Sequence, residues 1–272
     1  MNNYIGIDIG STSAKTVVMN RDRQILYKLI QPTGWSSVDT AASIKTQLEE
    51  AGISLEDAYV AATGYGRISV PYADKCITEI TCHGKGACFL HEQEDLTVID
   101  IGGQDTKLIS MENGMVSDFA MNDKCSAGTG RFLEVMSNTL GIRPEELCEL
   151  ASRGADTSIS SMCTVFAESE VISLIGRGES RENIAFAVVD SIVRKVGSQS
   201  ARFGGCSSAV CLTGGLCGFD YLRESLSSEL RKPVLSHQDG QYAGAVGAAL
   251  TAVSEGTRMQ CDSESGKKDV EQ

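Results

Sequence analysis

Two cysteines stand out because each lies directly before a segment with the pattern of a helix. Cys125 comes shortly before residues 130–136, whose apolar side chains repeat at helical spacing, and Cys163 directly precedes the similar segment 164–172. A thiolate at a helix N-terminus is stabilised by the partial positive charge and the unpaired N–H groups there. The pair therefore indicates a site for an anionic, thiophilic group.

The spacing of these two cysteines limits what one chain can bind. Cys125 and Cys163 are 38 residues apart and neither belongs to a Cys-x-x-Cys pair. Zinc and iron–sulfur sites normally take four protein ligands. A homodimer in which each subunit gives both cysteines would supply four. The alternative, two helix-capping cysteines without a ligand, stays open at this point.

The remaining cysteines are expected to be reduced and buried as small hydrophobic residues. The sequence begins without the basic and apolar pattern of a signal peptide, so a secreted disulfide framework is not expected. This expectation covers Cys76, Cys82, Cys88, Cys148, Cys206, Cys211, Cys217 and Cys261.

A second pattern, Asp-Ile-Gly followed by four residues and Lys, occurs twice. The first copy runs from Asp8 to Lys15 and the second from Asp100 to Lys107, each within a pair of apolar strands. A tight turn of this kind presents N–H groups and hydroxyls to phosphates, and an aspartate can hold Mg²⁺ through water. A hairpin turn without a ligand is the alternative for either copy alone.

The duplication predicts two similar α/β lobes with a nucleotide in the cleft between them. The first lobe is expected over residues 1–95 and the second over residues 96–253, with a polar, frayed tail over 254–272. The helix near the C-terminus is expected to pack back on the first lobe. Strands are expected at 24–30, 59–62, 114–121 and 210–215, and helices at 38–50, 73–90, 145–151, 181–203 and 240–250, with a further helix starting near Phe219.

Composition narrows the classes of partner. The net charge is −12 and the sequence pI is about 4.8, which argues against general nucleic-acid binding. No apolar run has the length of a membrane span, so a cytoplasmic protein without membrane contact is expected.

The loop 63–67, with two glycines around a tyrosine, indicates a close approach to a ligand or partner, or a simple turn.

Four segments of the chain form a recognisable set: 122–132 (NDKCSAGTGRF), 161–170 (SMCTVFAESE), 63–67 (TGYGR) and 100–105 (DIGGQD). Together they resemble the activator ATPases of 2-hydroxyacyl-CoA dehydratases, a family that extends to the ATPase subunits of benzoyl-CoA reductases (the BadF-type ATPases). The resemblance covers about residues 4–252, and Ser126 stands where the family usually has alanine.

The resemblance implies a duplicated ribonuclease H-like fold, that of actin, Hsp70 and sugar kinases (ASKHA), and a homodimer with one bridging [4Fe–4S] cluster held by Cys125 and Cys163. It also implies bound ATP or ADP with Mg²⁺. Asp8, Asp100 and Gln104 would then be catalytic. The nucleotide would be bound by Ser11, Thr12, Ser13, Ala14, Lys15, Gly102, Gly103, Gly214, Gly215 and Gln241.

The function implied is ATP-driven delivery of one low-potential electron to a partner dehydratase or reductase that carries its own iron–sulfur cluster. A ferredoxin or flavodoxin would supply the electron. Two alternatives remain open: an ATP-binding redox sensor that delivers no electron, and a small-molecule kinase of the same fold.

Overall fold

The computed structural model describes residues 3–122, 126–160, 163–203 and 209–268, with the backbone alone for 261–268. The chain divides into two compact units, which are considered separately below. Unit 1 comprises Met1–Phe89 and Tyr242–Gln272, and unit 2 comprises Leu90–Gln241.

Unit 1 is built on a five-stranded sheet with the order β3-β2-β1-β4-β5. The first three strands form antiparallel hairpins, and β4 and β5 continue the sheet in parallel with β1. The strands are β1 (Asn3–Ile9), β2 (Ser13–Met19), β3 (Ile25–Pro32), β4 (Ala58–Thr63) and β5 (Lys75–Cys76). The helices are α1 (Ser37–Glu50), the 3-10 turn η1 (Arg67–Ser69), α2 (Glu79–His91) and α8 (Ala243–Lys268), which follows the 3-10 turn η2 (Gly240–Tyr242).

Unit 2 repeats this plan with the sheet order β10-β9-β6-β7-β8. Again two antiparallel hairpins are followed by strands parallel to the first. The strands are β6 (Leu96–Ile101), β7 (Thr106–Glu112), β8 (Met115–Asn122), β9 (Val210–Gly214) and β10 (Val234–Ser236). The helices are α3 (Gly130–Leu140), α4 (Pro144–Ala151), α5 (Thr164–Gly176), α6 (Arg181–Arg202) and α7 (Asp220–Leu230). The predicted duplicated α/β fold is confirmed.

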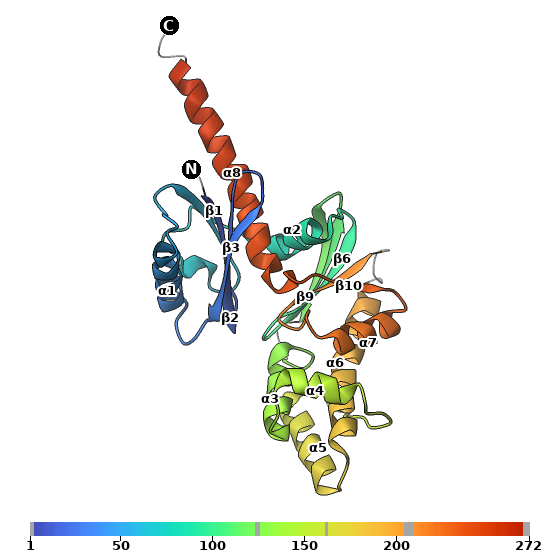
Figure 1. Cartoon of the computed structure of the whole chain (residues 1–272). Helices are drawn as coiled ribbons and strands as arrows, with labels where there is room; N and C mark the ends of the chain where they lie inside the picture. Colours follow the sequence, from blue (N-terminus) through green and yellow to red (C-terminus); the bar gives the residue numbers. More distant parts are fainter. Residues whose placement is uncertain (1–2, 123–125, 161–162, 204–208, 269–272) are drawn as a thin grey trace. The chain divides into compact units, whose positions relative to one another are not determined.

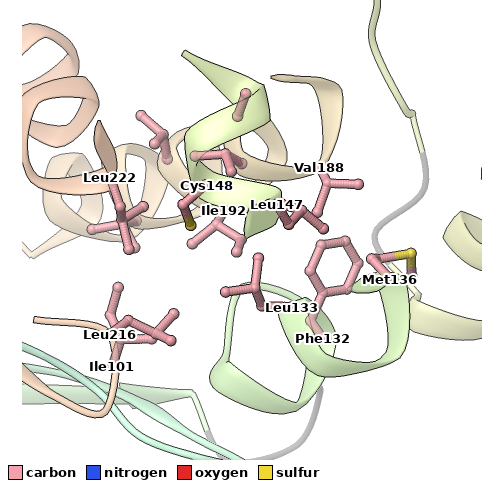
Figure 2. Packing of buried hydrophobic residues seen from close by; sticks show 14 of the residues in the cluster. Ile101, Phe132, Leu133, Met136, Leu147, Cys148, Val188, Ile192, Leu216 and Leu222 are labelled. Carbon is pink, nitrogen blue, oxygen red and sulfur yellow. The ribbon is translucent and has the colours of Figure 1, made fainter. Parts of the chain in front are cut away.

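The helices α3 to α6 gather at one end of unit 2 (Figure 1). Their apolar faces meet in one core, where Phe132 and Leu133 of α3 pack with Leu147 of α4 and Ile192 of α6 (Figure 2). All four side chains are at most 1% exposed. This core therefore fixes the segment after Cys125 against the long helix α6.

The small-residue helix α8 packs closely on the sheet of unit 1, against β1, β2 and β4 (Figure 1). A Cβ at Gly6 of β1 would lie 2.0 Å from the Ala245 carbonyl oxygen, so only glycine permits this approach. The segment expected to be a polar tail continues this helix as far as Lys268. Among the described residues, no helix is long and apolar enough to cross a membrane.

Two local expectations differ from the structure. Residues 73–78 are not helical: Lys75–Cys76 joins the sheet as β5 and α2 begins at Glu79. As a result Cys76 is exposed and Cys88 is half-buried, whereas Cys82, Cys148, Cys211 and Cys217 are buried as expected. Cys206 and the side chain of Cys261 lie outside the described residues.

Candidate functional site

The first turn (residues 8–15) joins β1 to β2 in unit 1. Asp8 and Lys15 face each other in the antiparallel register, and the Gly10 N–H donates to the Ser13 carbonyl at 3.2 Å. Thr33 holds the turn from outside: its N–H donates to the Thr12 carbonyl at 3.0 Å and its hydroxyl to the Gly10 carbonyl at 2.7 Å. Ser11 and Thr12 remain exposed, and Ala14 is buried. The turn is therefore fixed in shape and open at its tip.

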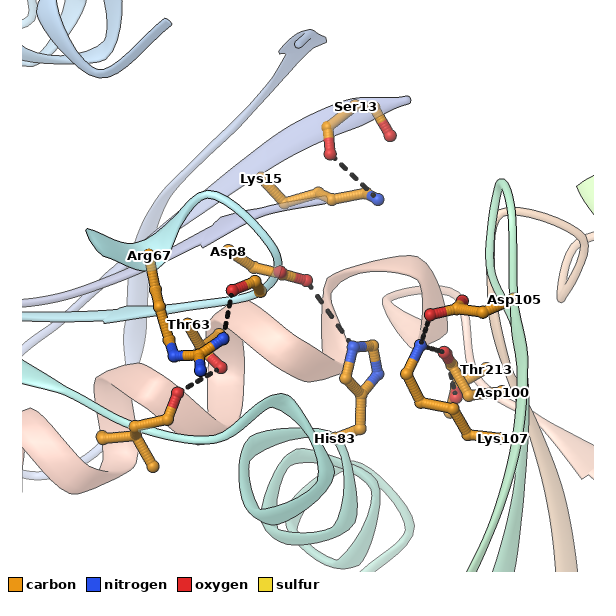
Figure 3. Close-up of polar contacts among 12 residues, drawn as sticks. Asp8, Ser13, Lys15, Thr63, Arg67, His83, Asp100, Asp105, Lys107 and Thr213 are labelled. Carbon is orange, nitrogen blue, oxygen red and sulfur yellow. Dashed lines mark hydrogen bonds and ion pairs between the residues drawn. The ribbon is translucent and has the colours of Figure 1, made fainter. Parts of the chain in front are cut away.

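Asp8 lies in a closely packed pocket of unit 1 (Figure 3). The side chain is 6% exposed, and Oδ2 lies 3.7 Å from Nε2 of His83 on α2. A Cβ at Gly64 would lie 2.4 Å from Oδ1, and one at Gly244 would lie 2.4 Å from Oδ2. The backbone of β4 and the start of α8 thus approach this carboxylate closely, while Lys15 is only half-buried and its Nζ lies 3.5 Å from the Ser13 carbonyl.

The second turn (residues 100–107) joins β6 to β7 in unit 2 and has the same register, with Asp100 opposite Lys107. Here both charged groups are buried, at 1% and 2% exposed. Lys107 Nζ donates to Asp100 Oδ2 at 3.3 Å and lies 2.8 Å from Asp105 Oδ2, while the Thr213 hydroxyl donates to Asp100 Oδ1 at 2.8 Å (Figure 3).

The tip of the second turn is open, like that of the first. The Gly102 N–H donates to the Asp105 carbonyl at 3.0 Å, which closes the turn, and Gln104 is exposed at its tip. A Cβ at Gly102 would lie 2.3 Å from Asp105 Oδ1, so a larger residue there would displace the Asp105 side chain from its position beside Lys107. Gly103 and Gln104 are thereby presented to solvent.

A second repeat, which the sequence analysis missed, accompanies each aspartate. Thr63-Gly64 ends β4 beside Asp8, and Thr213-Gly214 ends β9 beside Asp100, in the same parallel register. Both glycines have positive φ, +84° and +86°. The signal in the sequence was a Thr-Gly pair at the end of a buried strand in each lobe.

Two of the residues predicted to bind the nucleotide, Gly215 and Gln241, line one cavity of unit 2 with a volume of about 340 Å³. Gly214 lies instead against Asp100: a Cβ there would be 3.0 Å from Oδ1. Burial and the nearby Asp100 charge raise the pKa of the Cys217 thiol, another lining residue, to about 11. The cavity is also lined by Gly218, Asp220, Arg223, Ser236, His237 and Gln238.

The two cysteine segments meet in unit 2. Cys163 is the N-cap residue of α5 and is exposed, whereas Cys125 lies outside the described residues. Ser126 and Thr164, which directly follow the two cysteines in the sequence, are hydrogen-bonded to each other: their hydroxyls lie 2.8 Å apart.

The residues present fit a thiolate-bound cluster shared between two chains. An exposed thiol at a helix start faces outward at the place where both segments meet. Among the described residues no group of three or more His, Cys, Asp or Glu side chains is arranged to hold a metal ion.

The second turn is hydrogen-bonded directly to the segment that follows Cys125. The Gly130 N–H donates to the Gly102 carbonyl at 2.9 Å, and the Arg131 N–H donates to the Gly103 carbonyl at 2.8 Å. These N–H groups belong to the first turn of α3, where no helical partner exists. The Thr106 hydroxyl adds a bond of 3.0 Å to the Gly128 carbonyl. The second turn is therefore hydrogen-bonded both to the start of α3 and to the segment directly before it.

The sequence matches the BadF/BadG/BcrA/BcrD ATPase family over residues 5–252. The chain belongs to this ATPase family. A curated relative, the (R)-2-hydroxyglutaryl-CoA dehydratase activating ATPase of Acidaminococcus fermentans, is 42% identical over 91% of this chain and 96% of its own. As a BadF-type ATPase, the protein hydrolyses ATP.

Solved structures agree with this membership. The activator of the 2-hydroxyisocaproyl-CoA dehydratase from Clostridium difficile, with bound ADPNP, is 35% identical with a TM-score of 0.89, over 96% of this chain and 97% of that one. A ROK family glucokinase from Streptomyces griseus, at 16% identity and a TM-score of 0.59 over 91% and 98% of the chains, shows the shared ASKHA fold alone.

Proposed function

We propose that this ATPase delivers one electron of low potential to a partner 2-hydroxyacyl-CoA dehydratase or related reductase and so activates it. The characterised relatives are named as activators of such dehydratases. The partner would carry its own iron–sulfur cluster, and a ferredoxin or flavodoxin would resupply the electron.

The two turns would bind the phosphates and Mg²⁺ of the nucleotide. In unit 1, Ser11, Thr12 and Ser13 offer hydroxyls and N–H groups at an open tip, with Lys15 behind them. In unit 2, Gly102, Gly103 and Gln104 form the corresponding tip. Asp8 and Asp100 would orient Mg²⁺-bound water, and Gln104 would orient the attacking water. The cavity with Gly215 and Gln241 would take the nucleoside.

Cys125 and Cys163 of two subunits would hold one [4Fe–4S] cluster, which supplies a one-electron carrier when bound. The chain's own contribution is to place Cys163 at the exposed start of α5 and to join the two cysteine segments through Ser126 and Thr164. Thr139 of α3 also donates to Glu168 of α5 at 3.2 Å, so the two helices move together.

The observation that carries the proposal is the pair of hydrogen bonds from Gly130 and Arg131 to the carbonyls of Gly102 and Gly103. A γ-phosphate at the tip of the second turn would shift these carbonyls, and α3 would follow because its first N–H groups are bonded to them. ATP and ADP would then hold the cysteine segments differently, which couples hydrolysis to electron delivery.

The test is to purify the full-length protein anaerobically, count its iron, and assay candidate dehydratases for ATP-dependent reduction. Wild type should hold about four irons per dimer. Cys163→Ser should lose the iron and the electron transfer, whereas Cys76→Ser, which also changes an exposed cysteine, should keep both. A dimer that retains its iron after Cys163→Ser contradicts the ligand assignment. A wild-type dimer that holds iron but reduces no partner with ATP favours the redox sensor instead.

A further inference from the structure

A second cavity of unit 2, with a volume of about 290 Å³, lies on one face of the second half of α6. Six lining residues follow the helical spacing i, i+3, i+4, i+7, i+8 and i+11, so they share that face. These six are Ser191, Arg194, Lys195, Ser198, Gln199 and Arg202, and the cavity is completed by Ala127, Gly128, Ile159 and Ser160.

The lining has a strong positive charge in an acidic protein. Arg194, Lys195 and Arg202 line the cavity and no carboxylate does, although the chain carries a net charge of −12. Arg194 forms an ion pair of 2.7 Å with Asp190, which lies outside the lining, and its side chain is still 63% exposed. Asp190 offsets the charge of Arg194, and the carboxylate of Glu170 accepts hydrogen bonds from the N–H and hydroxyl of Ser160 at 2.7 and 2.8 Å. The positive charge offered to an anion therefore comes chiefly from Lys195 and Arg202.

A further feature distinguishes this cavity from an ordinary solvated helix face. The side-chain oxygen of Gln199 is buried and has no hydrogen-bond partner among the described residues. This oxygen is a hydrogen-bond acceptor, so its partner has to be a donor: a water molecule, or the O–H of a protonated phosphate group bound in the cavity.

The cavity also touches the segment that follows Cys125. Gly128 has a φ of +84°, and a Cβ there would lie 2.9 Å from Cγ of Lys195, so the lysine stem packs directly over this glycine. The Gly128 carbonyl in turn accepts the hydroxyl of Thr106 from the second turn. An occupant of the cavity therefore lies against the same short segment that the second turn holds.

We propose that this cavity binds a small multivalent oxyanion, a phosphate or a pyrophosphate group, at a site separate from the nucleotide turns. Two guanidinium groups, one ammonium group and the hydroxyls of Ser191 and Ser198 can donate to several oxygens of one such anion. The bound anion bridges α6 and the Gly128 segment, which follows Cys125 in the sequence. Anion binding itself does not depend on the proposed electron transfer.

The test measures binding of radiolabelled inorganic phosphate and pyrophosphate to the full-length protein by equilibrium dialysis. The protein is first saturated with Mg²⁺ and the non-hydrolysable analogue ADPNP, so that the phosphate positions at the two turns are filled. We expect one saturable site per chain. Lys195→Met and Arg202→Met should each weaken binding about tenfold or more, because each removes a charge-assisted hydrogen bond. Arg153→Met is the matched control, since it removes an exposed cation of the same unit away from the cavity.

Three outcomes overturn the proposal: no saturable binding to the wild type, unchanged affinity in Lys195→Met and Arg202→Met, or an equal loss in Arg153→Met. Thermal melting of each variant shows whether a loss of binding is merely a loss of folding, and Arg202→Lys, which keeps the charge, should restore part of the affinity. A different result would be that phosphate does not bind, while an acidic redox protein reduces Lys195→Met and Arg202→Met more slowly than the wild type. The face would then be a protein-docking surface, and the small-anion site would be wrong.

Discussion

The first and second turns have the same sequence pattern and the same strand register, yet their charged groups lie in different surroundings. In unit 2, Asp100 and Lys107 are almost fully buried and bonded to each other, and the group is completed by Thr213 and Asp105. In unit 1, Lys15 is half-buried and Asp8 lies beside His83. A duplicated motif can thus keep its backbone while one copy acquires an internal ion-pair network.

The threonines that accompany the two aspartates show the same divergence. The Thr213 hydroxyl donates to Asp100, whereas the equivalent Thr63 hydroxyl donates to the Ile77 carbonyl at 3.0 Å, on the segment after β5. Thr213 therefore orients a carboxylate, and Thr63 fastens an edge of the sheet.

The two turns also differ in the segments that are hydrogen-bonded to them. The first turn is hydrogen-bonded to Thr33, which lies in the loop before α1. The second turn is bonded to Gly128, which precedes α3, and to Gly130 and Arg131, the first two residues of α3. The copies share the turn chemistry that we propose binds phosphates, and the second one is also hydrogen-bonded to the segment that follows Cys125 in the sequence.

The largest difference between the two turns is expected in stability, when the lysine of each turn is replaced separately by methionine. Lys107→Met leaves the buried Asp100 without its cation, which should lower the free energy of unfolding by about 3–5 kcal/mol. Lys15→Met removes a half-buried cation with one long hydrogen bond and should cost less than about 1 kcal/mol. Urea unfolding of both variants measures the difference. Equal losses would show that the two turns are equivalent in spite of their different burial.

Replacing either aspartate should reduce ATP turnover while leaving the iron in place. Asp8→Asn and Asp100→Asn each remove a carboxylate charge that we place near Mg²⁺, and a loss of about 100-fold in turnover is expected for each. Steady-state hydrolysis and iron analysis of the same anaerobic preparations check both parts. If hydrolysis survives in both variants, the assignment of the turns to the phosphates is wrong.

Thr106 offers a way to give the second turn the residue that the first turn has, because Ala14 occupies the equivalent register position. Thr106→Ala removes the hydroxyl bonded to the Gly128 carbonyl and should cost about 1–3 kcal/mol in stability. We propose that the nucleotide and the cysteine segments are coupled through the second turn by about 1–3 kcal/mol, and this variant removes one of the connecting hydrogen bonds. The iron-chelation rate with ATP, divided by the rate with ADP, should therefore move toward one.

Ser117→Ala is the control for this variant, since the Ser117 hydroxyl donates to the Ser110 carbonyl on the far side of the same hairpin. It should leave the ratio of chelation rates unchanged. Identical rates with ATP and ADP already in the wild type would contradict a nucleotide-dependent movement of the cysteine segments.

The sequence predicted those parts of the fold that have local signals. The duplicated turns, the helix over 38–50 with Gly52 behind it, and Pro144 at the start of α4 all follow from neighbouring residues. The partnership of Thr213 with Asp100 joins residues 113 positions apart, and it follows only from the parallel pairing of β6 with β9. The bonds from α3 to the second turn depend likewise on tertiary packing, as does the burial of Lys107, because charged residues are expected at the surface.

The smallest effect concerns two buried thiols, one beside each aspartate. Burial, with a smaller contribution from the nearby charges of Asp8 and Asp100, raises the pKa of Cys82 to about 12 and that of Cys217 to about 11. The folded state holds these protons more tightly than the unfolded state, so stability is unaffected below the unfolded thiol pKa of about 9 and falls above it. At about pH 10 each thiol should have lowered the free energy of unfolding by about 1.4 kcal/mol relative to neutral pH. Cys82→Ala and Cys217→Ala should each flatten the decline measured by urea unfolding from about pH 7 to about pH 10. We expect the two variants to flatten the decline in the free energy of unfolding to a similar extent, since burial is the larger cause of the raised pKa in both units. If only one variant flattens this decline, the thiol replaced in the other variant ionises without loss of stability.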